Sequence, residues 1–420
     1  MIVLKNASIF GANTASSAKN ATIVINGDRI ESVGADTGIP DGADVVIDLK
    51  GKFVLPGLID AHVHFGGTER FDRPGISDRH ESYDFLESRT EALKWGVTTI
   101  RSAGDYTPEI FEFRDEAGKN QHISPRIKAA GKILQARGGH PMDTVFGSNK
   151  KMSDNAAVMI DDKTDLDAEI KKLAAAGADW IKAVISEINK VDYPKPIPRI
   201  PREKIGQIVE IAHKYGKPCM IHVDNVRHMR EAAEAGADSI EHVLSIGATE
   251  TDIDDDLIEM LIKKQIYVVP TVYSIKAHEN PEGSMPLVYG NDKLIEQINR
   301  LIRAGVKIGV GTDASIPFVK IGESLHEELS QLVRCGMTPA EAIAAATSGN
   351  AKLLRMDDEI GSISPGYYAD MVIVEEDPAG GVDRTKNICF TIMNGQIIGM
   401  GAASAEKVVR VETKNYCNKN

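Results

Sequence analysis

The chain has 420 residues, of which 42% are hydrophobic and 26% are charged, and its formal net charge is −12. We expect no nucleic-acid partner, because phosphate binding needs a basic surface. No apolar stretch approaches the ~20 residues that span a bilayer, so we expect no membrane partner. The N-terminus lacks the pattern of a signal peptide, and the scattered cysteines are typical of free thiols. We therefore expect a cytoplasmic globular protein.

Short β-prone runs occur at both ends of the chain. They are residues 2–4, 21–25, 45–47, 368–374 and 389–395. Turn-forming sequences such as Asn26-Gly27-Asp28 separate them. The N-terminal part is too short to close a sandwich alone. We predict that residues 1–56 and 356–420 form one small composite β-sandwich domain, with residues 57–355 inserted between them.

The middle of the chain repeats one unit: an amphipathic helix, a glycine and a short β-branched strand. The glycines are Gly96, Gly177, Gly236 and Gly305, placed where a helix ends in a left-handed residue. The predicted strands cover residues 53–64, 97–100, 127–134, 180–184, 218–223, 239–243, 267–272 and 306–310. Alternation of helices and strands predicts a parallel sheet. Eight units in ~300 residues fit an α/β (β/α)8 TIM barrel. The alternative is an open doubly wound sheet, although no Gly-x-Gly-x-x-Gly follows the first strand.

Ionisable side chains occur near the ends of otherwise apolar strands, where barrel enzymes carry their active sites. His62 and His64 are two residues apart on the first strand and therefore point the same way. The others are Lys182, His222, His242 and Asp313, on the fourth, fifth, sixth and eighth strands. Buried charge is costly unless it is paired or metal-bound, and imidazole and carboxylate are metal ligands. The pattern favours a metal site, although a protonated lysine cannot ligate a metal.

These motifs resemble the amidohydrolase superfamily, in the branch of imidazolonepropionase-like proteins and bacterial Xaa-Pro dipeptidases. The matching segments are residues 55–64, 177–182, 221–223, 240–242, 311–313 and 361–370. The resemblance implies a barrel with a split β domain and two divalent metal ions, with zinc as the expected metal. It implies that Lys182 is carboxylated by CO2 and bridges both ions. The ligands that it implies are His62, His64 and Asp313 for one ion and His222 and His242 for the other.

The resemblance also implies a mechanism. A metal-bridging hydroxide would attack the amide carbon, while Asp313 would take the proton of the water and deliver it to the leaving amine. His140 follows the third strand and would face the substrate, as in this branch, and donate to an oxyanion or a carboxylate. Further predicted substrate contacts are Arg101, Asp224, Arg227 and Tyr273. The sequence departs from the branch in two places: Asp224 and Asn225 occupy the region where a tyrosine is expected, and Pro141 lies where a glycine is expected.

We predict a metal-dependent hydrolase that cleaves an amide bond of a small molecule, a dipeptide of the Xaa-Pro kind or an N-acyl amino acid. One alternative is a cyclic-amide hydrolase of the imidazolonepropionase or dihydroorotase type. Another, with less support because all the expected ligands are present, is a non-catalytic binding protein on the same barrel. A deaminase is disfavoured because Asn225 replaces the glutamate of a His-x-x-Glu pattern. A homo-oligomer is compatible with the resemblance, but no interface can be identified. Residues 66–80 and 143–163 follow strands one and three, and we predict that they form walls of the substrate pocket.

Overall fold

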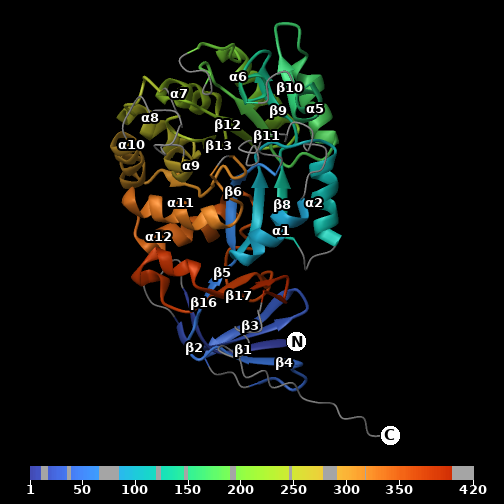
Figure 1. The fold of residues 1–420 in the computed structure, drawn as a ribbon, viewed down its shortest axis with the longest axis vertical. Coiled ribbons are helices and arrows are strands. Elements are labelled where there is room, and N and C mark those ends of the chain that lie inside the picture. The colour runs from blue at the N-terminus through green and yellow to red at the C-terminus, as the bar shows by residue number, and fades with distance from the viewer. Residues whose placement is uncertain are drawn as a thin grey trace.

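The computed structural model describes residues 1–10, 18–35, 39–65, 85–119, 124–145, 150–189, 195–245, 248–277, 291–316 and 318–399. Figure 1 shows a small sheet at the end of the molecule that carries the N-terminus, next to a larger body of parallel strands and helices. Among the helices described, none combines the length and the apolar composition that a membrane span requires.

Both ends of the chain build the small sheet. Its strands are β1 (Ile2–Ile9), β2 (Ala18–Asn26), β3 (Arg29–Ala35), β4 (Val45–Asp48), β5 (Phe53–Pro56), β16 (Met371–Val374), β17 (Ile388–Met393) and β18 (Gln396–Ile398). Their order is β18-β17-β16-β5-β1-β2-β3, with β4 paired to β1. The two ends meet where β5 pairs antiparallel with β16. The predicted pairing of the ends is therefore confirmed, and the sheet is consistent with a sandwich. The domain boundaries stay a prediction.

The parallel strands form two further sheets. The first has the order β6 (Leu58–Val63), β7 (Val97–Ser102), β8 (Arg126–Ala129). The second has the order β10 (Ala157–Ile160), β9 (Ile133–Ala136), β11 (Ile181–Val184), β12 (Cys219–His222), β13 (Ser239–Glu241), β14 (Tyr267–Val269), β15 (Lys307–Ile308). Every segment that the sequence predicts as a strand of the barrel overlaps with at least one of these strands.

Main-chain hydrogen bonds connect the two parallel sheets. Ala61 N donates to Val310 O at 2.9 Å, and Asp313 N donates to His62 O at 2.8 Å, so the chain beyond β15 runs along β6. On the other side, the third predicted strand is split. Its first part, β8, pairs with β7, and its second part, β9, pairs with β11. These are the neighbours that a barrel requires, whereas full closure of an eight-stranded barrel stays a prediction.

Two features differ from the predicted strands. Residues 53–64 form two strands in different sheets, β5 and β6. At the junction, a Cβ on Gly57 would lie 2.1 Å from Thr98 Oγ1, so the chain passes where only glycine fits. The edge strand β10 was not predicted. It lies with α4 (Lys150–Ala156) inside residues 143–163, so that segment is largely regular structure. Residues 66–80 lie outside the described residues.

Helices pack around the parallel strands. They are α1 (Phe85–Lys94), α2 (Glu109–Lys119), α3 (Met142–Val145), α5 (Leu166–Ala175), α6 (Arg202–Lys214), α7 (Val226–Ala235), α8 (Asp255–Lys263), α9 (Val272–Ala277), α10 (Asn291–Ala304), α11 (Glu323–Arg334), α12 (Pro339–Ala344) and α13 (Asn350–Leu353). Short helices η2 (Ala345–Gly349), η3 (Pro378–Gly380) and η4 (Val382–Lys386) follow. The predicted helix-ending glycines have positive φ angles of 75°, 105°, 82° and 84° for Gly96, Gly177, Gly236 and Gly305, which confirms their role.

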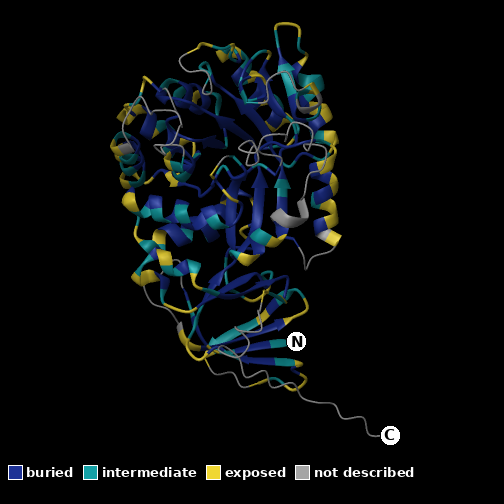
Figure 2. Ribbon diagram, in the orientation of Figure 1, coloured by how far each residue is buried: buried dark blue, intermediate teal, exposed yellow. Residues whose placement is uncertain are grey.

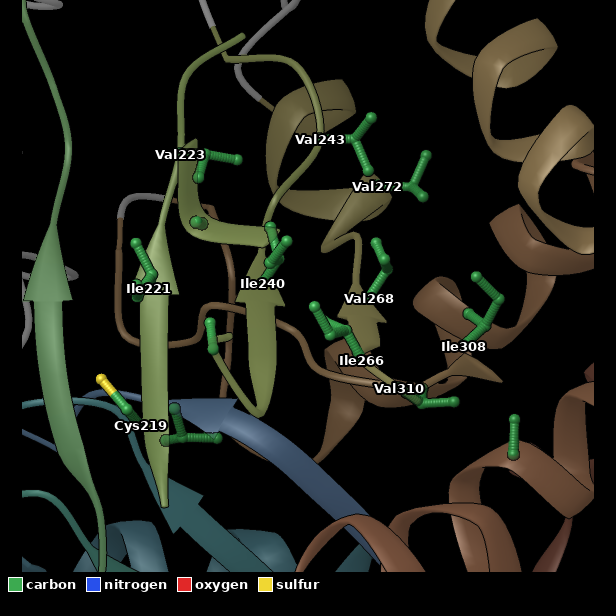
Figure 3. Close-up of a cluster of buried hydrophobic side chains, with 14 of the residues drawn as sticks. Cys219, Ile221, Val223, Ile240, Val243, Ile266, Val268, Val272, Ile308 and Val310 are labelled. Carbon is green, nitrogen blue, oxygen red and sulfur yellow. The ribbon is translucent and has the colours of Figure 1, made fainter. Parts of the chain in front are cut away.

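Alternate residues of a parallel strand face two different clusters. Cys219 and Ile221 of β12 belong to the large cluster between strands and helices that Figure 3 shows. Met220, between them, belongs to a separate cluster with Trp180. Figure 2 shows the strands buried and the helices with one buried and one exposed face. Because of this alternation, His222 points to the same side as Met220, away from the helices.

Candidate metal centre

Three predicted ligands come together at the end of β6. The ligand atoms of His62, His64 and Asp313 all lie within 4.8 Å of one another. The Oδ1 atom of Asp313 is 3.3 Å from His64 Nε2 and 3.4 Å from His62 Nε2. The main-chain bond from Asp313 to His62 fixes this approach. Residues from the first and the last predicted strands therefore form one cluster.

Further histidine rings extend this cluster in a row. The ring centroids of His62 and His242 are 5.0 Å apart, those of His242 and His222 are 4.4 Å apart, and those of His222 and His140 are 5.4 Å apart. These side chains come from β6, from the residue after β13, from β12 and from the segment after β9. The structure thus gathers every predicted histidine of the site, with His140 at one end of the row.

Lys182 faces the same cluster from β11. Lys182 pairs with Met220 of β12 in the parallel sheet, and only 2% of its surface is exposed. Burial lowers the pKa of His62 to about 4, and the positive charge of Lys182 acts in the same direction. The fourth strand therefore places its lysine close enough to act on the histidines electrostatically.

In each histidine of the row, and in His64, one ring nitrogen contacts a protein group and the second ring nitrogen could contact a ligand. The contacts are His62 Nδ1 to Glu241 Oε2 (2.6 Å), His64 Nδ1 to Gly104 O (2.8 Å), His242 Nδ1 to Thr271 Oγ1 (2.6 Å), His222 Nε2 to Asp224 Oδ1 (3.0 Å) and His140 Nδ1 to Thr144 Oγ1 (2.7 Å). Contacts of this kind orient the imidazoles of metal sites and fix their tautomers. A metal ligated by His222 would accordingly be bound through Nδ1, and the others through Nε2.

The acidic groups of the cluster are held in their charged forms. Burial alone raises the pKa of Asp313, but contact with His64 and the neighbouring histidines lowers it well below its ordinary value. Burial alone likewise raises the pKa of Glu241, but Arg101 and the hydrogen bond from His62 outweigh it and lower that pKa as well. The site is therefore a buried arrangement of imidazoles and carboxylates.

The donor set fits a divalent cation. His62 Nε2 is buried and, within the described part of the chain, has no hydrogen-bond partner, which is costly for a polar atom unless a ligand satisfies it. Neutral imidazole nitrogens and a carboxylate oxygen are the ligands that zinc prefers. The residues at the end of β6 therefore suit a divalent metal ion.

Comparison with known proteins agrees with this geometry. Residues 53–398 match the model of a protein family that is described as "Amidohydrolase family". The chain belongs to the amidohydrolase family. It is thus an enzyme of a family that acts on C–N bonds.

Its relatives differ in their substrates. The chain is 26% identical over 391 residues to an ochratoxinase of Aspergillus niger, covering 86% of this chain and 78% of that protein. It is 24% identical over 374 residues to an imidazolonepropionase of Streptomyces coelicolor, covering 85% of this chain and 86% of that protein. A crystal structure of a Xaa-Pro dipeptidase with bound methionine superimposes with a TM-score of 0.80 at 26% identity, covering 94% of this chain and 99% of that one.

Arg101 of this amidohydrolase lies near the end of β7, the second predicted strand of the barrel. Its side chain is fully buried, and its donors contact Ala61 O at 2.5 Å, Ser239 Oγ at 3.0 Å and Glu241 Oε1 at 2.8 Å. The guanidinium also stacks over the ring of Trp180 at 4.5 Å. The side chain that was predicted to contact the substrate is therefore enclosed by groups of the protein.

The other predicted substrate contacts also have partners within the protein. Asp224 is buried and accepts a hydrogen bond from Ser186 Oγ at 2.5 Å, besides its contact with His222. Arg227 pairs with Glu187 and, at 3.0 Å, with Glu250. Tyr273 is half-buried and packs on the large core cluster. None of these placements shows a side chain directed at a substrate.

Sequence reasoning missed two residues of the amidohydrolase site. Glu241 lies beside His242 in a motif that was recognised, but only the histidine received a role. The usable signal was strand alternation: Ile240 belongs to the outer cluster, so Glu241 must point inward. His242 follows Glu241 directly and would point outward if the strand continued. Its positive φ of 69° ends the alternation of the strand, so its side chain also points inward. Thr271, which holds His242, follows an apolar strand and gave no comparable signal.

Proposed function

We propose that this amidohydrolase is a binuclear metal-dependent hydrolase that cleaves an amide bond of a small substrate, a dipeptide or an N-acyl amino acid. One observation carries the proposal: His62, His64 and Asp313 converge within 4.8 Å, next to a row of histidines that are each held by their other ring nitrogen. The proposal takes the two parallel sheets as parts of one closed barrel.

The chain would hold two divalent ions, with zinc as the expected metal. His62, His64 and Asp313 would bind one ion, and His222 and His242 the other. Lys182, carboxylated by CO2, would offer an anionic group to both, which a protonated amine cannot do. When bound, the ions would supply Lewis acidity toward the amide carbonyl and toward a water molecule.

Asp313 is the residue that we assign to proton transfer. Its carboxylate stays charged, since its pKa is lowered by contact with His64 and the neighbouring histidines despite burial, and its side chain keeps 16% of its surface exposed. It would accept the proton of the attacking water and give it to the leaving nitrogen as the C–N bond breaks and the new C–O bond forms.

His140 is the residue that we assign to the substrate. Thr144 holds its Nδ1 at 2.7 Å, and its ring lies 5.4 Å from that of His222. When Thr144 Oγ1 donates to Nδ1, the ring carries its proton on Nε2, which would donate to an oxygen of the substrate on the side of His222. The support for dipeptides is the similarity to the Xaa-Pro dipeptidase, and N-acyl amino acids contain the same kind of amide bond to an amino acid.

A second candidate function is hydrolysis of a cyclic amide, which the similarity to imidazolonepropionase favours. The two candidates differ in the expected metal content. A carboxylated Lys182 that bridges two ions requires a binuclear site, whereas we expect one ion in an imidazolonepropionase-like site. A non-catalytic binding role has no specific observation in its favour.

Metal content is the decisive experiment. Protein reconstituted with zinc and bicarbonate should contain about two equivalents of zinc, as a bridged pair requires. Lys182→Ala, and the parent protein reconstituted without CO2, should both contain less than the parent. Lys128→Ala is the matched control, since Lys128 also lies on a parallel strand, β8, but pairs with Asp179 at 3.6 Å.

The outcomes separate the candidates. Two equivalents that depend on Lys182, followed by turnover of dipeptides or N-acyl amino acids, would support the proposal. About one equivalent, unaffected by Lys182→Ala, would indicate single-metal chemistry and direct the substrate screen to cyclic amides. Failure of the parent to bind zinc would refute both metal-dependent functions.

A further inference from the structure

Four of the histidines are proposed metal ligands, and three kinds of group hold them: a main-chain carbonyl, a hydroxyl and carboxylates. Gly104 O can only accept a hydrogen bond, so it fixes the proton of His64 on Nδ1. Thr271 Oγ1 can donate or accept, so it leaves the tautomer of His242 undetermined. Glu241 and Asp224 hold His62 and His222 with carboxylates. The two carboxylates differ in what contacts their second oxygen. This difference decides whether an amide in place of the carboxylate could turn its oxygen toward the histidine.

Glu241 is fully buried and occupied on both oxygens. Its Oε2 accepts from His62 Nδ1 at 2.6 Å, while its Oε1 accepts from Arg101 Nη2 at 2.8 Å and from Ser239 Oγ at 2.5 Å. Arg101 itself is anchored by Ala61 O and by the ring of Trp180. A guanidinium has no acceptor, so the side of Glu241 that faces Arg101 must always present an oxygen.

Asp224 is buried in a different setting. Its Oδ1 contacts His222 Nε2 at 3.0 Å, and its Oδ2 accepts from Ser186 Oγ at 2.5 Å. A hydroxyl group can reverse its role from donor to acceptor. The side of Asp224 that faces Ser186 could therefore present either an oxygen or an amino group.

We propose that Arg101 and Glu241 are positioning residues that lock His62 in the tautomer protonated on Nδ1, which leaves the Nε2 lone pair directed at the metal site. The inference rests on the proposed function, since it concerns a ligand of the proposed metal. It gives Arg101 a role other than substrate binding: Arg101 dictates the orientation of Glu241, and Glu241 dictates where His62 carries its proton.

The inference predicts an unusual effect of replacing a carboxylate by an amide. In Glu241→Gln, Arg101 holds the amide oxygen, so the amino group must face His62 Nδ1. The ring would then carry its proton on Nε2, where it cannot ligate a metal, as in hydrolytic triads whose orienting aspartate becomes asparagine. In Arg101→Met/Glu241→Gln the amide can turn round, because Ser239 Oγ can accept from its amino group. Adding Arg101→Met to Glu241→Gln should therefore restore the Nδ1-protonated tautomer of His62 that Glu241→Gln removes.

The test is zinc affinity, measured by competition with a chelator on the full chain. We expect E241Q to bind zinc about 100-fold more weakly than the parent, and R101M/E241Q to regain about 10-fold of that loss. Asp224→Asn is the matched control with the same chemical change, and its loss should stay within about 10-fold. Nitrogen-15 shifts of histidine-labelled, metal-free protein should show one ring changing its protonated nitrogen in E241Q alone.

Several outcomes would overturn the inference. Unchanged affinity in E241Q, or a double variant that binds zinc more weakly than E241Q, would show that Arg101 and Glu241 act only as structural partners. If E241Q does not fold, R101M/E241Q is compared with R101M. The inference then requires zinc affinities within about 10-fold of each other, and a larger gap refutes it. A parent protein that binds no zinc would instead refute the proposed function, and so the two failures are distinguishable.

Discussion

Gly311 lies where the chain beyond β15 runs close to β6, and Gly311→Ala should separate these segments. A Cβ at this position would lie 2.6 Å from His62 Cβ, 2.7 Å from Val269 Cγ1 and 2.9 Å from His62 N. Carbon atoms pack at about 3.5–4.0 Å, so the neighbours would have to move by about 1 Å.

The cost can be worked out from the bonds that such a shift would stretch. The bonds from Ala61 N to Val310 O and from Asp313 N to His62 O flank this contact. Each contributes about 0.5–1.5 kcal/mol, and overpacking a core costs about 1–3 kcal/mol. We expect Gly311→Ala to lower the free energy of unfolding by about 2–6 kcal/mol and to reduce zinc content, because His62 is displaced.

Urea denaturation of the metal-free protein measures this cost. Gly206→Ala is the matched control. It lies in α6, where a Cβ would meet nothing within 4 Å, and alanine in a helix should gain about 0.5–1 kcal/mol over glycine. Opposite signs for the two variants are expected. Unfolding of Gly311→Ala at the same urea concentration as the parent would refute the close approach of these segments.

Two buried groups predict how stability depends on pH. Burial lowers the pKa of His326 to about 4, so the stability that its neutral form contributes above pH 6.5 is lost as the pH falls towards 4, by up to about 3 kcal/mol. His326→Asn should therefore lose less unfolding free energy than the parent between pH 7 and 4.5 in urea titrations, and equal losses would contradict this. Burial raises the pKa of Glu328 to about 8, although the amides of Val272 and Tyr273 donate to it. The stability that its protonated form contributes is lost as the pH rises from 4.5 to 8. The difference in unfolding free energy between Glu328→Gln and the parent should therefore shift in favour of the variant by up to about 4 kcal/mol between pH 5 and 8. Parallel curves of unfolding free energy against pH would disprove this prediction.

The positions of the strands could be predicted because they follow from local patterns. Helix-ending glycines such as Gly96 and Gly236 mark each repeat, and the structure gives both a positive φ. The pairing of the chain ends was also predictable, because each end is β-prone but too short to fold alone. The edge strand β10 was not, since residues 157–160 form only a short apolar run whose pairing with β9 depends on tertiary contacts.

The candidate site could be predicted only in part. Residue type and position at a strand end were enough to select His62, His222 and Asp313. The surroundings of these residues were not predictable, because Arg101 and Glu241 are 140 positions apart and meet only in the fold. A charged residue at a strand end therefore signals chemistry, but whether it contacts the substrate or supports another side chain is a property of three-dimensional packing.

The pairing of β5 with β16 has a consequence for how the protein is made. Strand β5 leaves the ribosome early, but its antiparallel partner, Met371–Val374, follows only after roughly 300 further residues, which takes on the order of 15–60 s at about 5–20 residues per second. During that time one edge of β5 has no partner strand, and such edges attract foreign strands. Nascent chains stalled before residue 371 should therefore be the form that most needs a chaperone.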